Sequence, residues 1–173
     1  MIMYKALIKT MRPRQWPKNV FILAAIIFDR QLSLTNPVPL LRTLIGFVLF
    51  CLLSSAVYIL NDLMDIEADR MHPVKRNRPI ASGQLPVSVA IAVEIILLLV
   101  VFPSSYALSS GFFYTSLVYF VTNIAYSLWL KHIPLIDVLV LASGFLLRVV
   151  AGVTIIHVER FSPWLYVVTT LLA

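Results

Sequence analysis

The fold is decided by the stretch VPLLRTLIGFVLFCLLSSAVYIL (residues 38–60) and by the run NDLMDIEAD (residues 61–69) that directly follows it. The first stretch carries one charged side chain, Arg42, and is long enough to cross a hydrocarbon core about 30 Å thick as a helix. The second run is rich in carboxylates. The sequence therefore predicts a membrane-spanning helix that ends in acidic residues at one face of a bilayer.

The composition of the whole chain agrees with a membrane location. The 173 residues are 60% hydrophobic and 13% charged, and the mean hydropathy is +0.92, whereas a typical soluble domain is about 25% charged. A soluble domain of this size has no water-free place for so much apolar surface. We therefore expect an all-α, multi-span transmembrane helix bundle. In such a protein the net charge of +6 reports loop charge and orientation, so we expect no nucleic-acid partner.

Charge and proline divide the chain into five apolar runs and part of a sixth, at residues 16–28, 38–60, 85–102, 106–130, 135–156 and 163–173. We expect one membrane domain over residues 1–173. The last run provides about half a span before the sequence stops. Because a natural terminus rarely falls inside a membrane, we expect the chain to be truncated.

The distribution of lysine and arginine predicts the orientation, because cytoplasmic loops are enriched in both. Ten cations lie in the N-terminal segment up to the start of the first run, after the second run or after the fourth: Lys5, Lys9, Arg12, Arg14, Lys18, Arg70, Lys75, Arg76, Arg78 and Lys131. The opposite loops hold Arg30 and Arg160. We therefore expect the N-terminus and both charged loops to be cytoplasmic.

The acidic run has the residue types and the spacing of a metal site. At about 100° per residue, Asn61, Asp65 and Asp69 lie within about 80° of one another on a helix, with Asp62 beside them. Oxygen-only ligands suit Mg²⁺, which takes one or two carboxylates and bridges to substrate phosphates. The alternative is a solvated helix end whose charge is neutralised by the basic loop that follows. The spacing alone leaves both interpretations open.

That loop, RMHPVKRNRP (residues 70–79), places four cations directly after the acids: Arg70, Lys75, Arg76 and Arg78. Acids for a metal ion beside arginine forks for phosphate are typical of a diphosphate site. The alternative is that the positive-inside rule alone requires cations in this loop, with no ligand.

Polar residues near the end of the fourth run form a stripe. Asn123, Ser127 and Lys131 are spaced at i, i+4 and i+8, and Tyr126 lies beside them. Polar groups inside a span are costly and usually face a cavity or a partner. Tyrosine and lysine are also ordinary residues of the membrane interface, so the stripe predicts a cavity mainly through its asparagine and serine.

Two further groups of cations need partners. Arg148 lies within the fifth run, where it must pair with a lipid-linked phosphate, a backbone carbonyl or Asp137. The stretch RPRQWPKN (residues 12–19) places cations and an indole at the cytoplasmic level of the acidic run. An amphipathic membrane anchor is the alternative interpretation of that stretch.

Taken together, these motifs resemble the UbiA superfamily of intramembrane prenyltransferases. The pattern Asn61-Asp62-x-x-Asp65-x-x-x-Asp69 resembles its first aspartate motif, and Tyr126-Ser127 followed by Lys131 resembles its tyrosine and lysine at the end of the fourth span. Within the superfamily, residues 12–19, 69–83, 126–137 and 144–148 are most similar to the decaprenyl-phosphate phosphoribosyltransferases.

The resemblance implies an enzyme that transfers 5-phosphoribose from phosphoribosyl diphosphate to polyprenyl (decaprenyl) phosphate and releases diphosphate, a step toward lipid-linked arabinose and cell wall. It implies Mg²⁺ held by Asn61, Asp62, Asp65 and Asp69. It also implies phosphate contacts from Lys18, Lys75, Arg76, Arg78, Lys131 and Arg148, and other substrate contacts from Asn19, Tyr126 and Ser127. The resemblance implies a location in a bacterial plasma membrane. It also allows the protein to be an oligomer.

One departure from the superfamily pattern affects these expectations. The superfamily has about nine spans and a second aspartate motif between the sixth and seventh, whereas this sequence ends inside the sixth apolar run. We therefore expect the chain to be the N-terminal part of such an enzyme and to be inactive alone. Two alternatives stay open: a UbiA-type aromatic prenyltransferase of quinone or haem biosynthesis, and an inactive membrane fragment.

Overall fold

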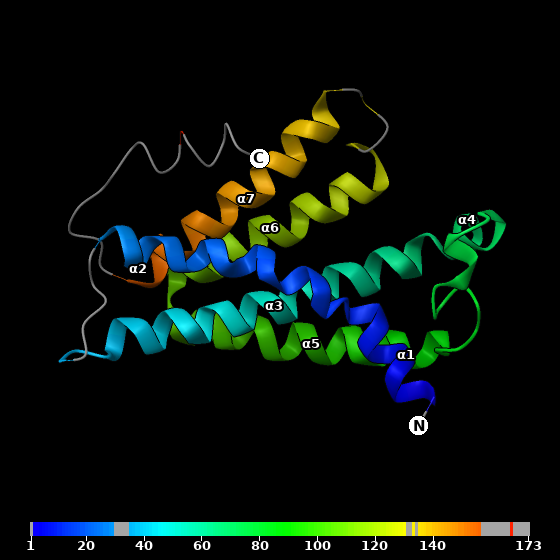
Figure 1. Ribbon diagram of the computed structural model, residues 1–173, viewed down its shortest axis with the longest axis horizontal. Coiled ribbons are helices and arrows are strands. Elements are labelled where there is room, and N and C mark those ends of the chain that lie inside the picture. The colour runs from blue at the N-terminus through cyan, green and yellow to red at the C-terminus, as the bar shows by residue number, and fades with distance from the viewer. Residues whose placement is uncertain (1, 30–34, 131–132, 134, 157–166, 168–173) are drawn as a thin grey trace.

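The computed structural model describes residues 2–29, 35–130, 133, 135–156 and 167, and within these residues it consists of helices and connecting turns, without strands (Figure 1). The predicted run at residues 163–173, apart from residue 167, and Lys131 lie outside the described residues. The elements are α1 (Ile2–Met11), the 3₁₀ helix η1 (Pro13–Leu23), α2 (Ala24–Phe28), α3 (Val38–Met64), α4 (Ile66–Met71), the 3₁₀ turn η2 (Lys75–Asn77), α5 (Val87–Leu108), α6 (Ser110–Leu128) and α7 (Ile136–Ile155).

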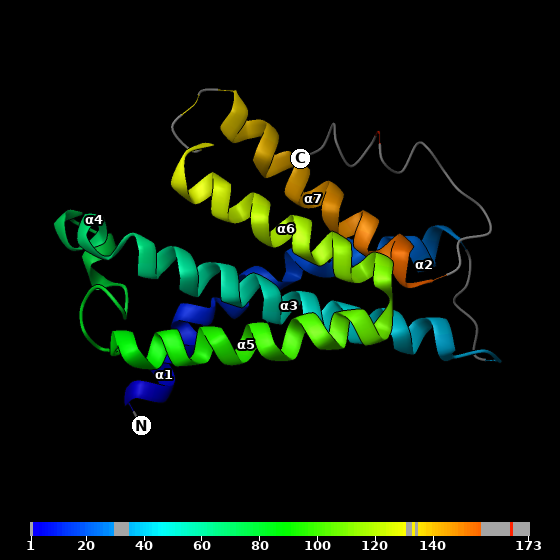
Figure 2. The same ribbon diagram turned by 180° about the vertical axis from the view of Figure 1, so that it is seen from behind.

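Helix α3 is the centre of the bundle. It packs against α5, α6, α7 and η1, while α6 packs between α5 and α7 (Figures 1 and 2). Its core side chains include Phe50 and Leu53, which are fully buried and lie in one apolar cluster with Ile22 of η1, Phe112 of α6 and Ala151 of α7. The apolar run that predicted this helix is therefore also the surface on which its neighbours assemble.

The outer helices present apolar side chains outward. On α5, Ile95, Ile96 and Leu99 are all more than half exposed, which in a soluble protein would be an interaction or aggregation surface. Within the described part of the chain, three helices, α3, α5 and α7, are long and apolar enough to cross a membrane by length and composition. The prediction of an all-α, multi-span membrane bundle is confirmed.

The first predicted run, residues 16–28, forms a 3₁₀ segment, η1, which continues into the short helix α2. Pro13 opens η1 and Pro17 lies inside it, and proline provides no backbone N–H for the regular α-helical ladder. The segment nevertheless packs closely, because a Cβ on Gly152 of α7 would lie 2.1 Å from the carbonyl oxygen of Ile22. Glycine at that position lets the two backbones touch.

The turn between the third and fourth predicted helices lies later in the chain than the sequence predicts. The expected break at residues 103–105 lies inside α5, which contains Pro103 and continues to Leu108. The chain turns at Ser109, whose extended backbone begins α6 and whose hydroxyl donates to the Thr154 carbonyl at 2.6 Å. A membrane helix tolerates an internal proline when neighbouring groups satisfy the freed backbone, so Ser109 and not Pro103 sets the boundary.

The acidic end of α3 lies at the same end of the bundle as α1 and α4, while α2 lies at the opposite end (Figures 1 and 2). The N-terminal cations of α1 and the loop after α4 are therefore gathered at one end, as the lysine and arginine pattern predicts for residues on one side of a membrane.

Candidate functional site

The acidic run continues the helical register past the end of α3. Helix α3 ends at Met64 and α4 begins at Ile66, with Asp65 between them. The backbone N–H of Asp65 donates to the Asn61 carbonyl at 3.0 Å, and that of Asp69 donates to the Asp65 carbonyl at 2.8 Å. Because these bonds keep the i to i+4 spacing, Asn61, Asp65 and Asp69 occupy successive turns, as the spacing predicts.

Two arginines compensate the buried acids of this run. Asp62 and Asp69 are each only 2% exposed. The Arg78 guanidinium donates to Asp69 at 2.7 Å and to Asp62 at 3.2 Å, and Arg12 donates to Asp62 at 2.6 Å. A buried carboxylate without a partner would carry a large desolvation cost. The pairing therefore explains how the fold accommodates carboxylates at this depth.

The pairing also bears on metal binding. Within the described residues, no group of three or more histidine, cysteine, aspartate or glutamate side chains is placed to hold a metal ion. The acidic run supplies carboxylate and amide oxygens, the donor types that Mg²⁺ prefers, so its chemistry fits the ion. In this arrangement, however, Asp62 and Asp69 serve the two arginines. A bound cation would take over part of the compensation that Arg12 and Arg78 provide.

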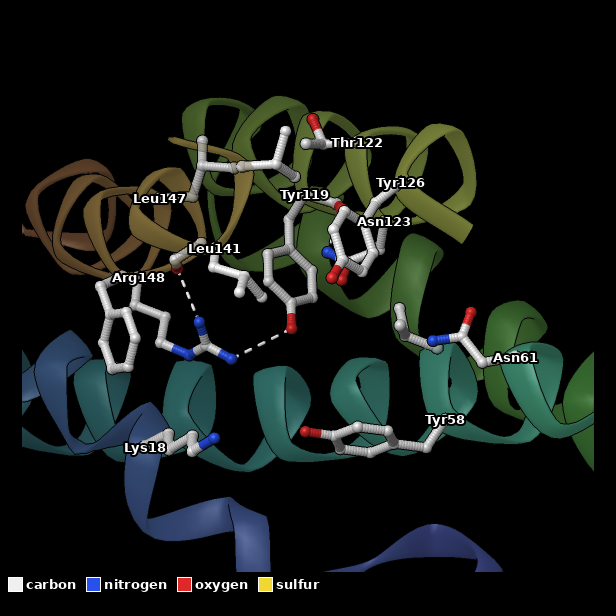
Figure 3. A pocket seen from close by; sticks show the side chains of 14 residues that line it. Lys18, Tyr58, Asn61, Tyr119, Thr122, Asn123, Tyr126, Leu141, Leu147 and Arg148 are labelled. Atoms are coloured by element: carbon white, nitrogen blue, oxygen red, sulfur yellow. Dashed lines mark hydrogen bonds between the residues drawn. The ribbon is translucent and has the colours of Figure 1, made fainter. Parts of the chain in front are cut away.

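A cavity of about 160 Å³ lies beside Asn61, between α3, α6, α7 and η1 (Figure 3). Its polar lining consists of Lys18, Tyr58, Asn61, Tyr119, Thr122, Asn123, Tyr126 and Arg148, and its apolar lining includes Val57, Leu141, Phe145 and Leu147. Ligand sites usually enclose about 300–1,000 Å³. The cavity is therefore smaller than a complete ligand site, and it can take the polar part of a substrate beside apolar side chains.

Arg148 is fixed by partners on three elements. Its Nε donates to Asn19 Oδ1 at 2.8 Å. One terminal nitrogen donates to the Gly144 carbonyl at 2.6 Å, and the other donates to the Tyr119 hydroxyl at 3.0 Å (Figure 3). Of the partners considered from the sequence, a backbone carbonyl is present, whereas Asp137 accepts a bond from the Val138 N–H. Among the residues that the structure describes, three of the five guanidinium N–H groups have an acceptor, which leaves two that could serve a ligand.

A second polar contact joins the cavity to the acidic run. The Ser127 hydroxyl of α6 donates to Asn61 Oδ1 at 2.5 Å, and Ser127 is buried. Ser127, a member of the polar stripe predicted on the fourth run, therefore contacts the acidic end of α3. Behind the cavity, Asn19 of η1 is fully buried; it donates to Cys51 Sγ at 3.3 Å and accepts from Arg148.

The predicted site residues thus fall into groups. Those that line the cavity are Lys18, Asn61, Tyr126 and Arg148. Asn19 and Ser127 contact residues of its lining, and Asp62, Asp69 and Arg78 form the ion-pair network. Lys75 and Arg76 are exposed on η2.

Sequence reasoning did not select Tyr58 and Tyr119, which line the cavity. Helical spacing could have found them. Tyr58 precedes Asn61 by three residues and Tyr119 precedes Asn123 by four, so each tyrosine lies on the same helix face as a polar residue that the sequence analysis had named. Arg12 was noted only for its charge. Its role depends on Asp62 and on the Tyr58 ring, whose centroid lies 4.7 Å from the guanidinium carbon.

Residues 20–173 match the UbiA prenyltransferase family, and the chain belongs to that family. It is 38% identical over 164 residues to a decaprenyl-phosphate phosphoribosyltransferase of Corynebacterium glutamicum, covering 94% of this chain and 49% of the relative. It is also 38% identical over 148 residues to the protein of that name from Mycolicibacterium smegmatis, covering 84% of this chain and 46% of the relative. The chain spans about half the length of these curated relatives.

A solved structure shares the fold. A UbiA homologue from Archaeoglobus fulgidus, solved with DMAPP and Mg²⁺ bound, superposes with a TM-score of 0.77 at 22% identity, covering 96% of this chain and 59% of the homologue. This similarity agrees with the family assignment and with a membrane protein.

Proposed function

We propose that the chain acts in the transfer of 5-phosphoribose from phosphoribosyl diphosphate to polyprenyl phosphate, with release of diphosphate. The observation that carries the proposal is the cavity wall, which joins Asn61 at the acidic helix end to the cations Lys18 and Arg148. The names and the 38% identity of the relatives support the same reaction. By family resemblance, the proposal includes a role in lipid-linked arabinose and cell-wall synthesis.

The arrangement suits a donor that carries several phosphates. Lys18 of η1 and Arg148 of α7 both line the cavity. Arg78, Lys75 and Arg76 lie on the segment after the acidic run. In this proposal the cavity cations orient the 5-phosphate of the ribose, and the cations after α4 hold the diphosphate. Lys131 joins them by family resemblance.

The reaction forms a bond between an oxygen of the polyprenyl phosphate and the anomeric carbon of the ribose. The bond from that carbon to the diphosphate oxygen breaks, and the diphosphate leaves with the electron pair. Because the attacking phosphate is already anionic, the step needs no strong base. Tyr126 and Asn123 provide hydrogen-bonding groups for the ribose hydroxyls within the same cavity.

Asn61, Asp65 and Asp69, with Asp62 adjacent, would hold Mg²⁺. The ion would supply charge neutralisation for the departing diphosphate. We propose that the polyprenyl tail lies against the exposed apolar helix surfaces, and that the N-terminus and the charged loops face the cytoplasm of a bacterial cell.

The test is an assay of the complete protein in membranes. Labelled phosphoribosyl diphosphate and polyprenyl phosphate should give a label extractable into organic solvent, dependent on Mg²⁺. Asp65→Asn should lower this rate by about 100-fold or more, the size of effect seen when one electrostatic stabiliser is removed. Glu67→Gln is the matched control, because Glu67 is an exposed acid on α4 and should retain activity.

Two outcomes would contradict the proposal. If the complete protein transfers a labelled prenyl group to hydroxybenzoate and incorporates no phosphoribose, it is an aromatic prenyltransferase. If Asp65→Asn and Asp69→Asn leave the rate and its Mg²⁺ dependence unchanged, the acidic run is not the metal site.

A further inference from the structure

A second hollow, separate from the cavity, lies along α1 and the start of η1. It encloses about 530 Å³ and is lined by the cations Lys5, Lys9, Arg12 and Arg14 with Ile8 and Gln15 among its other residues. We call it the basic groove. It shares no lining residue with the cavity at Asn61, and no acid lines it, so it attracts anions independently of the proposed reaction.

The cations of the basic groove are poorly compensated. Lys5 and Lys9 lie one turn apart on α1, where like charges repel. Arg12 pairs with Asp62. Within the described part of the chain, Lys5, Lys9 and Arg14 have no carboxylate within ion-pair distance. Three cations around one hollow therefore lack a counter-charge.

The backbone between α1 and η1 turns sharply at Arg12. Arg12 has φ 51° and ψ 57°, the left-handed conformation that residues with a Cβ rarely adopt. This conformation ends α1, and Pro13 then begins η1. The turn brings Arg12 and Arg14 to the same hollow as the lysines of α1. Backbone strain of this kind clusters at ligand-binding and other functional sites.

The surroundings of the groove favour a lipid. Ala6 and Thr10 are buried and hold α1 on the bundle, whereas Met3 is 53%, Tyr4 68% and Ile8 37% exposed. Apolar side chains next to lysines fit the boundary between acyl chains and phosphates, where interfacial helices lie. A free phosphate ion makes no use of that apolar surface.

We propose that the basic groove binds the headgroup phosphate of an anionic membrane phospholipid, with Lys5, Lys9 and Arg14 as its ligands and with Tyr4 and Ile8 against the acyl chains. The site goes beyond the proposed function, because it requires neither phosphoribosyl diphosphate nor a metal ion.

The test measures lipid binding to the complete protein, purified in detergent, by native mass spectrometry with phosphatidylglycerol and with phosphatidylcholine. Phosphatidylglycerol should bind more tightly. The double variant Lys5→Gln/Lys9→Gln should weaken its binding by about 30-fold, since each basic residue near a membrane contributes about a factor of five to attraction for anionic lipid. Lys5→Arg/Lys9→Arg keeps the charge and should retain binding.

The matched control is Arg42→Gln/Arg70→Gln, which removes the same charge outside the groove and should bind normally. A thermal unfolding midpoint for each variant checks that the fold is intact. An equal loss in the groove and control variants would overturn the proposal, because net charge alone would then explain binding. Displacement of the lipid by millimolar inorganic phosphate would also overturn it, because the groove would then be a site for a free anion.

Discussion

The guanidinium of Arg78 donates a 2.7 Å hydrogen bond to the carboxylate of Asp69, so that the loop after α4 folds back onto the acids that precede it. Arg78 also reaches Asp62 at 3.2 Å. Both carboxylates are 2% exposed, whereas the arginine side chain is 27% exposed. One partly accessible cation therefore compensates two buried acids, and a ligand can reach it from solvent.

Replacing Arg78 by alanine should destabilise the protein and increase the effect of Mg²⁺ on stability. Breaking a buried ion pair costs about 3–5 kcal/mol, and since Arg78 is partly exposed we expect about 2 kcal/mol. In the variant, a divalent cation is the remaining compensation for Asp69. Chemical unfolding with and without Mg²⁺ should show a larger stabilisation by the ion in the variant than in the parent.

The matched control is Arg70→Ala. Arg70 pairs with Glu67 at 3.0 Å, but the two side chains are 50% and 85% exposed, and exposed pairs contribute about 0–1 kcal/mol. Equal destabilisation by Arg70→Ala and Arg78→Ala would contradict the prediction, because the buried ion pairs of Arg78 would then contribute no more to stability than the exposed pair of Arg70.

Ser127→Ala should lower stability by about 1 kcal/mol, the usual net contribution of a hydrogen bond, because it leaves Asn61 Oδ1 without its donor. Ser110→Ala, at an exposed position of the same helix, should change stability little. A double-mutant cycle with Asn61→Ala isolates the pair. A coupling energy near zero would show that the contact does not link α6 to the acidic end of α3.

The parts of the fold that could be predicted are those that depend on local pattern. The helix containing residues 38–60 followed from an uninterrupted apolar run and its acidic end. The turn at Ser109 did not, because a proline is the stronger helix breaker in a sequence, whereas Ser109 is held by a contact with Thr154 that is distant in the chain. Likewise, the 3₁₀ form of η1 depends on how closely it packs against α7 as well as on its two prolines.

The sequence predicted which kinds of residue form the candidate site better than it predicted which side chains contact each other. Compensation of the acids by cations was expected, and Asn61 and Ser127 were both selected for their polarity. The pairing of Asn19 with Arg148 joins residues far apart in the chain, and helical periodicity carries information only within one element. The sequence alone therefore could not choose among the possible partners of Arg148.

Arg148→Lys should fail to replace arginine even though it keeps the charge. Arg148 donates to Asn19, Gly144 and Tyr119 in three directions, and a lysine ammonium cannot reproduce a planar fork. We expect a loss of about 2 kcal/mol or more for these buried, charged hydrogen bonds. Unfolding measurements test this, with Arg42→Lys as the control, since Arg42 donates to a single carbonyl, that of Leu108. Parent-like stability in Arg148→Lys would contradict a positioning role for the guanidinium.

Gly152→Ala should disrupt the contact between α7 and η1. A Cβ at residue 152 would lie 2.1 Å from the backbone carbonyl oxygen of Ile22 and 3.0 Å from its carbonyl carbon, and a backbone atom cannot move aside as a flexible side chain can. Overpacking of this kind costs about 1–3 kcal/mol. Gly144→Ala, on the same helix, is the matched control: the nearest neighbour of its Cβ would be Arg148 Nη1 at 3.4 Å, and alanine favours the helix.

Because η1 carries Lys18 and Asn19, displacement of η1 by Gly152→Ala should also lower activity in the complete protein. If unfolding measurements show Gly152→Ala to be as stable as Gly144→Ala, the close approach of η1 to α7 is not a fixed feature of the fold.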